Sequence, residues 1–398
     1  MSNNIDFSFF DTVYNRKNTS SVKYDAKPEG KVSPNKELIP MWIADMDFKV
    51  PPQVSARLTD IAQHGIYGYS QMGDTYFQAL TGWYQRRMQW EFQPKQTIQV
   101  PGVIFGISAA IRSLTQPADS ILICQPVYYP FAQVIKENGR RCVVSELKLN
   151  HDRYEMDFAD IEQKIVENSV KMLLFCSPHN PVGRVWQKEE LLKIAEICLK
   201  HDVFIVSDEI HSDFVFAPHR HLPMATLSEV IADRTVTCTA PSKTFNLAGL
   251  QVANLVITNP QIRKKVLEAC QVTGCKHLNT MAIAAAETAY QEGEQWLDTL
   301  LKYLENNMRI LQEGLADIEE IFLIPAEGTY LMWLDCRKLG LSDQQLKAFF
   351  LEEAGLWVHS GSTFGKGGSG FVRMNIACPQ AVLKTAVQRI RVAIKAKR

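Results

Sequence analysis

Short runs of apolar and β-branched residues alternate with longer amphipathic segments between about residues 100 and 260. The segment 189–200 places leucine, isoleucine and alanine on one side and lysine and glutamate elsewhere, which predicts a helix. The apolar runs predict buried strands at 121–124, 142–144, 172–176, 204–207, 235–239 and 254–258. Strands that alternate with helices favour a mostly parallel sheet covered on both faces, and so an α/β fold.

The remaining chain has a different pattern. We expect a long helix at 295–314, a strand with alternating exposure at 330–334, a helix at 346–354 and a late strand at 369–376. This order is typical of a smaller α+β domain. The polar segment up to about residue 40 predicts an arm that packs on the small domain or on a partner subunit. The predicted division is 1–48 for the arm and part of the small domain, 49–290 for the large domain and 291–398 for the small domain.

Composition limits the function classes. The 398 residues carry 43 basic and 43 acidic side chains, so no net charge favours a nucleic-acid or acidic-membrane partner. The sequence has no apolar stretch long enough to span a membrane, and its first residues lack the pattern of a signal peptide. The nine cysteines are scattered without a CxxC pair. Buried free thiols in a reducing cytoplasm are the expectation.

Polar residues follow three of the predicted strands at the point where each strand ends. Asn180 comes after 172–176, Asp208 after 204–207 and Lys243 after 235–239. Ligands bind beyond the carboxyl ends of strands in such sheets. Pyridoxal 5'-phosphate (PLP) chemistry needs this set: an amine to form a Schiff base, a carboxylate for the pyridine nitrogen and a donor to the ring hydroxyl. The alternatives are a surface lysine, and a carboxylate that pairs with a backbone amide or an arginine.

Three weaker signals agree with a PLP site. Gly102 permits a tight turn before a predicted helix at 104–114, whose first N–H groups could bind a phosphate with help from the Ser242 hydroxyl; a plain loop is the alternative. Tyr128 follows a strand and could stack on a flat cofactor, or it could be core packing. Arg373 lies in an apolar strand, so it requires an anion, either an internal carboxylate or a substrate α-carboxylate.

Two other sequence features are weaker evidence for a functional site. His219 and His221 resemble a metal pair but lack further ligands at useful spacing, so we expect them to cap a loop. The glycine-rich segment 365–370 follows no predicted strand and lacks a P-loop pattern, and it predicts a flexible loop near the active site.

Several motifs together resemble a known family. They are Ser177-Pro178-His179-Asn180-Pro181-Val182-Gly183, Ser207-Asp208-Glu209-Ile210-His211 and Ala240-Pro241-Ser242-Lys243-Thr244-Phe245-Asn246. This set is similar to fold-type I PLP enzymes of aminotransferase class I/II. Two more segments, Pro40-Met41-Trp42-Ile43-Ala44-Asp45-Met46-Asp47-Phe48 and 16–25, resemble the MalY/PatB-type cystathionine β-lyase (C–S lyase) subgroup. Tyr24 stands where that subgroup has a tryptophan.

The resemblance implies a role for each matching position. Lys243 would be the Schiff-base lysine, and Arg373 would bind the α-carboxylate of the substrate. Tyr69 would reach across a homodimer interface to the neighbouring cofactor. The remaining cofactor contacts would come from Val103, Ile104, Tyr128, Asn180, Asp208 and Ser242. The chain departs from the wider aminotransferase pattern at Gln251, where many members have an arginine, and at His211 beside the ring hydroxyl, where they have a tyrosine.

The sequence therefore predicts a cytoplasmic, homodimeric PLP enzyme that cleaves carbon–sulfur bonds by α,β-elimination. Its substrate would be a small sulfur amino acid such as cystathionine or cysteine, with release of a thiol or sulfide, pyruvate and ammonia. An aminotransferase of the same fold is the main alternative. A PLP-binding protein that acts mainly as a regulator is a third.

Overall fold

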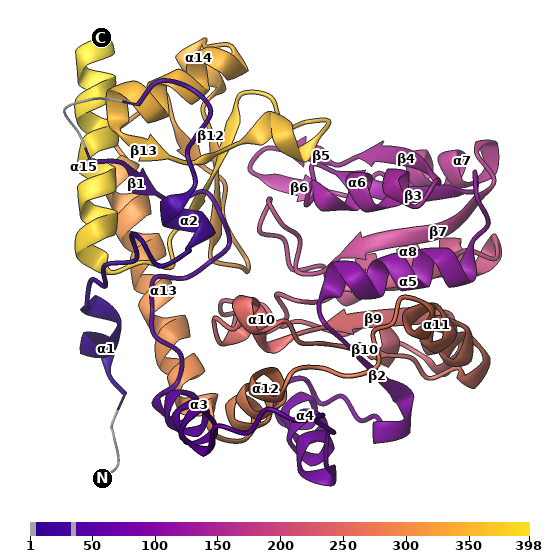
Figure 1. Ribbon diagram of the computed structural model, residues 1–398. Coiled ribbons are helices and arrows are strands. Elements are labelled where there is room, and N and C mark those ends of the chain that lie inside the picture. Colours follow the sequence, from indigo (N-terminus) through magenta and orange to yellow (C-terminus); the bar gives the residue numbers. More distant parts are fainter. Residues whose placement is uncertain (1–4, 33–36) are drawn as a thin grey trace.

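The computed structural model describes residues 5–32 and 37–398, and its largest sheet has seven strands, in the right half of Figure 1. The strand order is β2-β10-β9-β8-β7-β3-β4. The strands span Thr97–Val100 (β2), Ser120–Gln125 (β3), Arg141–Glu146 (β4), Val170–Cys176 (β7), Phe204–Asp208 (β8), Thr235–Thr239 (β9) and Ala253–Val256 (β10). All pairs from β9 to β4 are parallel, and β10 runs antiparallel to both of its neighbours, β9 and β2. The predicted mostly parallel α/β sheet is confirmed.

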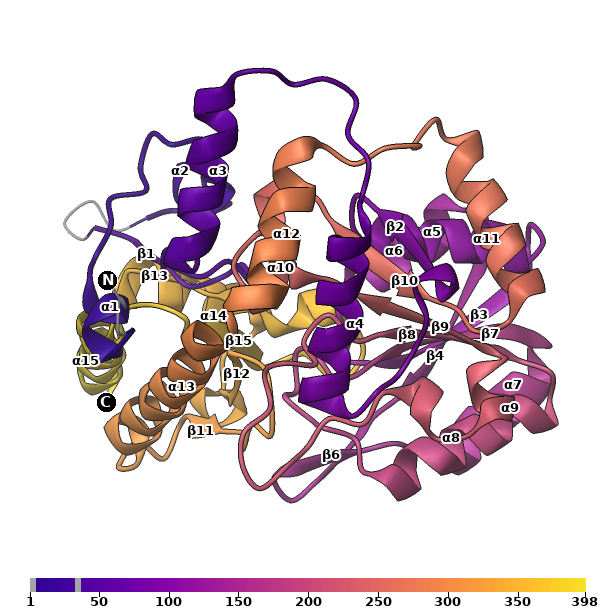
Figure 2. The ribbon, with the colours of Figure 1, turned by 90° about the horizontal axis from the view of Figure 1, so that it is seen from below.

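Helices cover both faces of this sheet, as its apolar strands require. One apolar cluster joins the sheet to α5 (Val103–Leu114), α6 (Pro130–Glu137) and α11 (Pro260–Val272). The opposite cluster joins it to α7 (Phe158–Glu167), α8 (Lys188–Lys200) and α9 (Glu229–Ala232). Figure 2 shows the two groups on opposite sides of the strands. The helix predicted at 189–200 begins one residue earlier, at Lys188.

A second, antiparallel sheet has the order β11-β12-β15-β14. Its strands are Phe322–Leu323 (β11), Leu331–Asp335 (β12), His359–Ser360 (β14) and Phe371–Asn375 (β15). Two long helices, α13 (Glu294–Leu315) and α15 (Gln380–Lys397), pack together beside it. The segment predicted as a helix at 346–354 forms the end of α14 (Asp343–Ala348) and a π-helical turn, Phe349–Ala354.

The alternating exposure predicted for 330–334 is wrong, since all five residues are buried. Met332 and Leu334 join the cluster that includes α13 and α15. Trp333 points the other way, into the cluster of the large sheet, where its indole N–H donates to the Tyr154 hydroxyl at 3.1 Å. Both faces of β12 are therefore covered, and a strand covered on both faces does not alternate.

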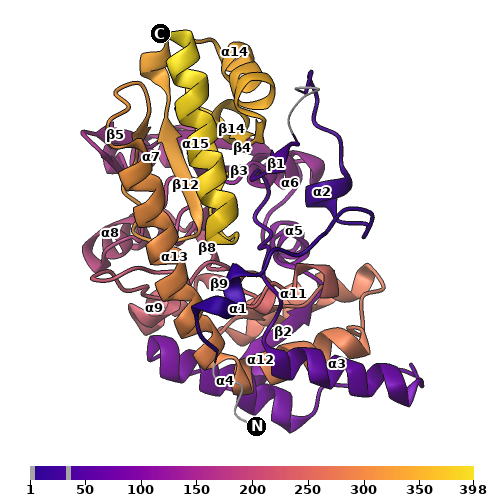
Figure 3. The same cartoon turned by 90° about the vertical axis from the view of Figure 1, so that its left-hand side faces the viewer.

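The N-terminal segment packs against the C-terminal part of the chain. α1 (Phe7–Asp11) lies beside α13 (Figure 3). The Phe10 ring in α1 contacts the rings of Trp296 and Tyr303 on α13. Strand β1 (Ile39–Pro40) pairs in parallel with β13 (Leu356–Trp357). Positions 1–4 and 33–36 of the predicted arm lie outside the described residues.

The other elements connect these parts. They are α2 (Val22–Asp25), α3 (Pro52–His64), α4 (Asp74–Met88), the hairpin β5 (Lys148–Asn150) and β6 (Arg153–Glu155), α10 (Pro241–Thr244) and α12 (Thr280–Glu292). α12 packs on α3 and α4. The predicted domain division near residue 290 falls close to the junction of α12 and α13. Across the described ranges, no helix is both long and apolar enough to cross a bilayer.

Candidate active site

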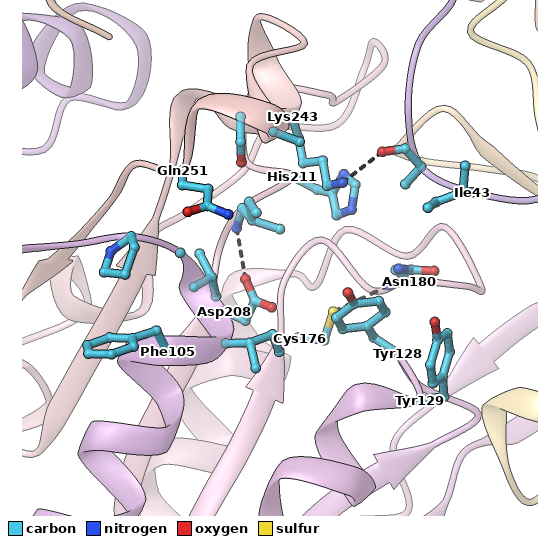
Figure 4. A pocket seen from close by; sticks show the side chains of 18 of the residues that line it. Ile43, Phe105, Tyr128, Tyr129, Cys176, Asn180, Asp208, His211, Lys243 and Gln251 are labelled. Carbon is cyan, nitrogen blue, oxygen red and sulfur yellow. Dashed lines mark hydrogen bonds between the residues drawn. The ribbon is translucent and has the colours of Figure 1, made fainter. Parts of the chain in front are cut away.

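A cavity of about 480 Å³ lies where the carboxyl ends of β7, β8 and β9 face the second sheet and the segment after β1 (Figure 4). Nine of the ten site residues predicted from the sequence line it. They are Val103, Ile104, Tyr128, Asn180, Asp208, His211, Ser242, Lys243 and Arg373. Tyr69, the tenth, does not line the cavity.

Lys243 lies in the short helix α10, four residues after β9 ends. Its ammonium donates a hydrogen bond of 2.7 Å to the carbonyl oxygen of Ala44. Burial lowers the pKa of the amine to about 8, because desolvation disfavours the charged form, and the positive charge of Arg373 acts in the same direction. The alternative of a surface lysine is excluded, and this amine is partly neutral near pH 8.

Asp208 is the last residue of β8 and is 4% exposed. One carboxylate oxygen accepts a hydrogen bond of 3.1 Å from the N–H of Ile210. Burial raises the pKa of this carboxyl from 3.8 to about 7. None of the ion pairs found in the described chain involves Asp208, so a buried acid faces the cavity without a cation bound to it.

Arg373 projects from β15 and is 3% exposed. Its guanidinium donates to the side-chain oxygen of Asn180 at 2.9 Å and to the carbonyl of Trp42 at 2.7 Å. The Nε atom is buried without an acceptor. Burial lowers the pKa of Arg373 to about 10. No carboxylate within the described ranges forms an ion pair with Arg373. Of the two partners that the sequence allowed, an internal carboxylate is therefore excluded, and a substrate α-carboxylate is left.

The N-terminus of α5 borders the cavity beside the Ser242 side chain. The first N–H groups of a helix have no acceptor within it, so those of Val103 and Ile104 are free to bind an anion. Gly102 precedes them with φ at 176°, an extended conformation. Any residue can adopt this conformation, so the site does not depend on a glycine at this position, and the helix begins where an anion site needs it.

Two further predicted residues are His211 and Tyr128. Burial lowers the pKa of His211 to about 3, so its ring is neutral, and its Nδ1 is buried without a partner. This ring packs edge-on against Tyr330 at 5.9 Å. Tyr128 is half-buried in the cavity wall, and burial raises the pKa of its hydroxyl to about 12. Core packing therefore buries only part of the Tyr128 ring.

Sequence reasoning missed several residues that line the cavity: Trp42, Ile43, Ala44, Tyr129, Cys176 and His359. Ala44 contributes through its backbone carbonyl, which no side-chain pattern can reveal. Tyr129 adjoins Tyr128, and that adjacency was an available signal. His359 comes from β14, which pairs with the strand of Arg373.

The remaining sequence features have different surroundings. Tyr69 is 100% exposed in the single chain and lies between α3 and α4. The ring of His221 lies 2.8 Å from the buried carboxylate of Glu209, and the loop-capping role expected for His219 and His221 stays a prediction. The described residues contain no cluster of three potential metal ligands. The backbone N–H of Lys366, in the glycine-rich segment, donates to the Gln125 side chain at 2.9 Å. The nine cysteines are all free, as predicted.

Comparison with known proteins identifies the class of protein that this fold and site define. The family model of aminotransferase class I and II matches residues 36–390. The chain therefore belongs to this family, and the fold-type I architecture expected from the sequence is confirmed.

Individual relatives show which subgroup of the family this chain resembles. Cystathionine beta-lyase PatB of Bacillus subtilis (strain 168) is 39% identical over 97% of this chain and 99% of its own length. The crystal structure of cystalysin from Treponema denticola, which contains PLP, has a TM-score of 0.93 and 37% identity, and covers 98% of this chain and 99% of that one. A PLP-bound C–S lyase from Staphylococcus hominis has a TM-score of 0.90 and 31% identity, over 97% and 98% of the two chains. The predicted similarity to the C–S lyase subgroup is confirmed.

Proposed function

We propose that this protein is a PLP-dependent C–S lyase that releases a thiol or sulfide, pyruvate and ammonia from cysteine or an S-substituted cysteine. The observation that carries the proposal is the partly buried Lys243 side chain, whose amine has its pKa lowered to about 8, in one cavity with the unpaired acid Asp208 and the cation Arg373. The names of the relatives support the reaction class.

The cavity residues fit PLP. Asp208 offers a buried carboxylate without a cation, which suits a protonated pyridine nitrogen. The side-chain oxygen of Asn180 is bound by Arg373, which leaves its NH₂ group to donate to the ring hydroxyl. Tyr128 would stack on the ring. The phosphate would bind the N–H groups of Val103 and Ile104 and the hydroxyl of Ser242. His211 offers a neutral ring on the side of the PLP ring hydroxyl.

When it is bound, PLP withdraws electrons from the α-carbon of the substrate. The residues of the chain then have separate tasks. Arg373 binds the α-carboxylate, which offers an acceptor to the guanidinium, whose buried Nε has no other partner, and fixes the orientation of the Cα–H bond. Neutral Lys243 takes the Cα proton onto Nζ. The Cβ–S bond breaks, the sulfur leaves as a thiolate that gains a proton, and one water molecule completes the conversion to pyruvate and ammonia.

Elimination is favoured over transamination by two residues of the site. Gln251 lines the cavity where many aminotransferases have an arginine on the phosphate, and His211 stands in place of a tyrosine. The test supplies the holoenzyme with L-cysteine or L-cystathionine and no keto acid. Continuous release of pyruvate with thiol or sulfide supports the lyase. Turnover that requires an added keto acid would instead identify an aminotransferase.

The assembly and the compartment belong to the same proposal. Ile66, Tyr67 and Tyr69 are exposed apolar or aromatic side chains between α3 and α4, and such a cluster is typical of a subunit interface. We infer a homodimer in which Tyr69 reaches the cofactor of the other subunit. The nine free thiols favour a reducing cytoplasm. Light scattering of wild type and of Tyr69→Asp would test the dimer, because a charge at the interface weakens association.

A further inference from the structure

One wall of the cavity is aromatic and partly open. Tyr129 and His359 have ring centroids 5.4 Å apart, and Trp42 lies 6.2 Å from His359. None of the three rings is fully buried, and all three line the cavity. Trp42 is held by stacking on Trp357, with centroids 4.4 Å apart and planes at 12°. This wall therefore offers partly exposed aromatic rings to a bound molecule.

The aromatic wall adjoins the carboxylate-binding end of the cavity. Arg373 donates to the carbonyl of Trp42, and one of its guanidinium nitrogens lies 3.5 Å from the Nδ1 atom of His359. Figure 4 shows Tyr129 beside Tyr128 and Asn180, on the side of the pocket away from Asp208. In the same view Asp208 and Phe105, which is near the start of α5, lie on the other side, whereas the cofactor contacts Tyr128 and Asn180 adjoin Tyr129. A substrate held by Arg373 would consequently extend its sulfur substituent along Trp42, Tyr129 and His359.

This wall has no charge. The charged side chains that line the cavity, in the part of the chain that the structure describes, are Asp208, Lys243 and Arg373, and each already has a role. Burial and the nearby Arg373 lower the pKa of His359 to about 3, so its ring is neutral. The described wall thus offers no charged partner to the far end of a substrate.

We propose that the aromatic wall formed by Trp42, Tyr129 and His359 selects cysteine S-conjugates with an uncharged apolar or aromatic substituent over cystathionine. This inference rests on the proposed lyase activity. The far end of cystathionine carries an ammonium and a carboxylate, and moving such groups from water to an uncharged wall is costly. An aromatic substituent gains apolar contact and favourable ring packing there.

The first test compares S-benzyl-L-cysteine, L-cysteine and L-cystathionine with the holoenzyme by pyruvate release. We expect kcat/KM for S-benzyl-L-cysteine to exceed that for L-cystathionine by about tenfold or more. Equal values, or a preference for L-cystathionine, would overturn the inference and leave the lyase activity intact. No pyruvate from any of the three would instead overturn the proposed function.

The second test uses the ratio of kcat/KM for S-benzyl-L-cysteine to that for L-cysteine. Tyr129→Ala removes a ring of the wall and should lower this ratio about tenfold, whereas Tyr129→Phe keeps the ring and should retain the ratio. Phe322→Ala, an exposed aromatic residue of β11 outside the cavity, is the matched control. An unchanged ratio in Tyr129→Ala contradicts a substituent site at this wall.

Discussion

The amine of Lys243 donates a 2.7 Å hydrogen bond to the carbonyl of Ala44, which is 199 residues away in the sequence. The hydroxyl of Tyr330 also points to this carbonyl, at 3.4 Å. Neighbouring carbonyls are held in the same way, since Asn375 donates to those of Ile43 and Asp45. The segment that follows β1 is thus fixed by its backbone, and it holds the Lys243 amine inside the cavity.

Because burial lowers the pKa of Lys243 to about 8, its reaction with PLP should depend on pH in that range. Only the neutral amine is a nucleophile. The rate at which the cofactor-free protein takes up PLP, followed by absorbance, should rise with pH and level off above a midpoint near 8. A midpoint near 10.4, the value of an ordinary lysine, would contradict the buried environment.

Asp208→Asn should have opposite effects on stability and on cofactor binding. The folded acid has a pKa near 7 and the unfolded acid one near 3.8. The folded, cofactor-free protein therefore holds a proton that the unfolded chain has lost, and stability falls as pH rises between these values. Asparagine does not titrate, so the cofactor-free variant should have a higher Tm than wild type at pH 8, with a smaller difference at pH 5.

The affinity of Asp208→Asn for PLP should nevertheless fall about a hundredfold, since a buried ion pair loses one partner. Fluorescence titration with PLP measures this loss. A variant that binds PLP as tightly as wild type would show that Asp208 does not pair with the pyridine nitrogen. Glu162→Gln, a change to a carboxylate on the surface of α7, is the control and should leave both quantities unchanged.

Arg373→Lys should raise KM strongly and lower the Tm only slightly. Lysine keeps a positive charge but loses the planar fork that matches a carboxylate. We expect KM for L-cysteine to rise about tenfold or more, because loss of a buried charged hydrogen bond costs about 2–5 kcal/mol. Steady-state kinetics and a thermal melt together make the test. A KM within twofold of wild type would place the α-carboxylate elsewhere.

Lys23 should be important for stability although it lies outside the cavity. It is 1% exposed, and its ammonium lies 2.8 Å from the carboxylate of Asp47 and 2.9 Å from the carbonyl of Asp45. Lys23→Met should reduce the free energy of unfolding in urea by about 2 kcal/mol, because Asp47 loses a buried charged hydrogen bond but keeps its 2.8 Å ion pair with Arg16.

The matched control is Lys17→Met, which removes the exposed ion pair between Lys17 and Glu37. Exposed pairs contribute only about 0–1 kcal/mol, so this variant should unfold almost like wild type. Equal losses in Lys17→Met and Lys23→Met would mean that the segment around Asp47 is not held by the buried pair.

Much of the site was predictable because parallel strands bring their carboxyl ends to one edge. That rule predicted that Asn180, Asp208 and Lys243 lie close together, although the paths of the loops were unknown. Burial of both faces of β12 was not predictable, since the same apolar residues suit a half-covered strand. The contacts of Ala44 and His359 depend on where distant segments cross the cavity. Tyr69 depends on a second subunit, so its role remains a prediction.

The central claim is that a PLP molecule becomes covalently attached to Lys243. Borohydride reduction of the holoenzyme, followed by peptide mass spectrometry, tests it most directly. We predict one adduct, on the peptide that contains Lys243, and none in Lys243→Ala. An adduct on another lysine, or no adduct in protein incubated with PLP, would contradict the account.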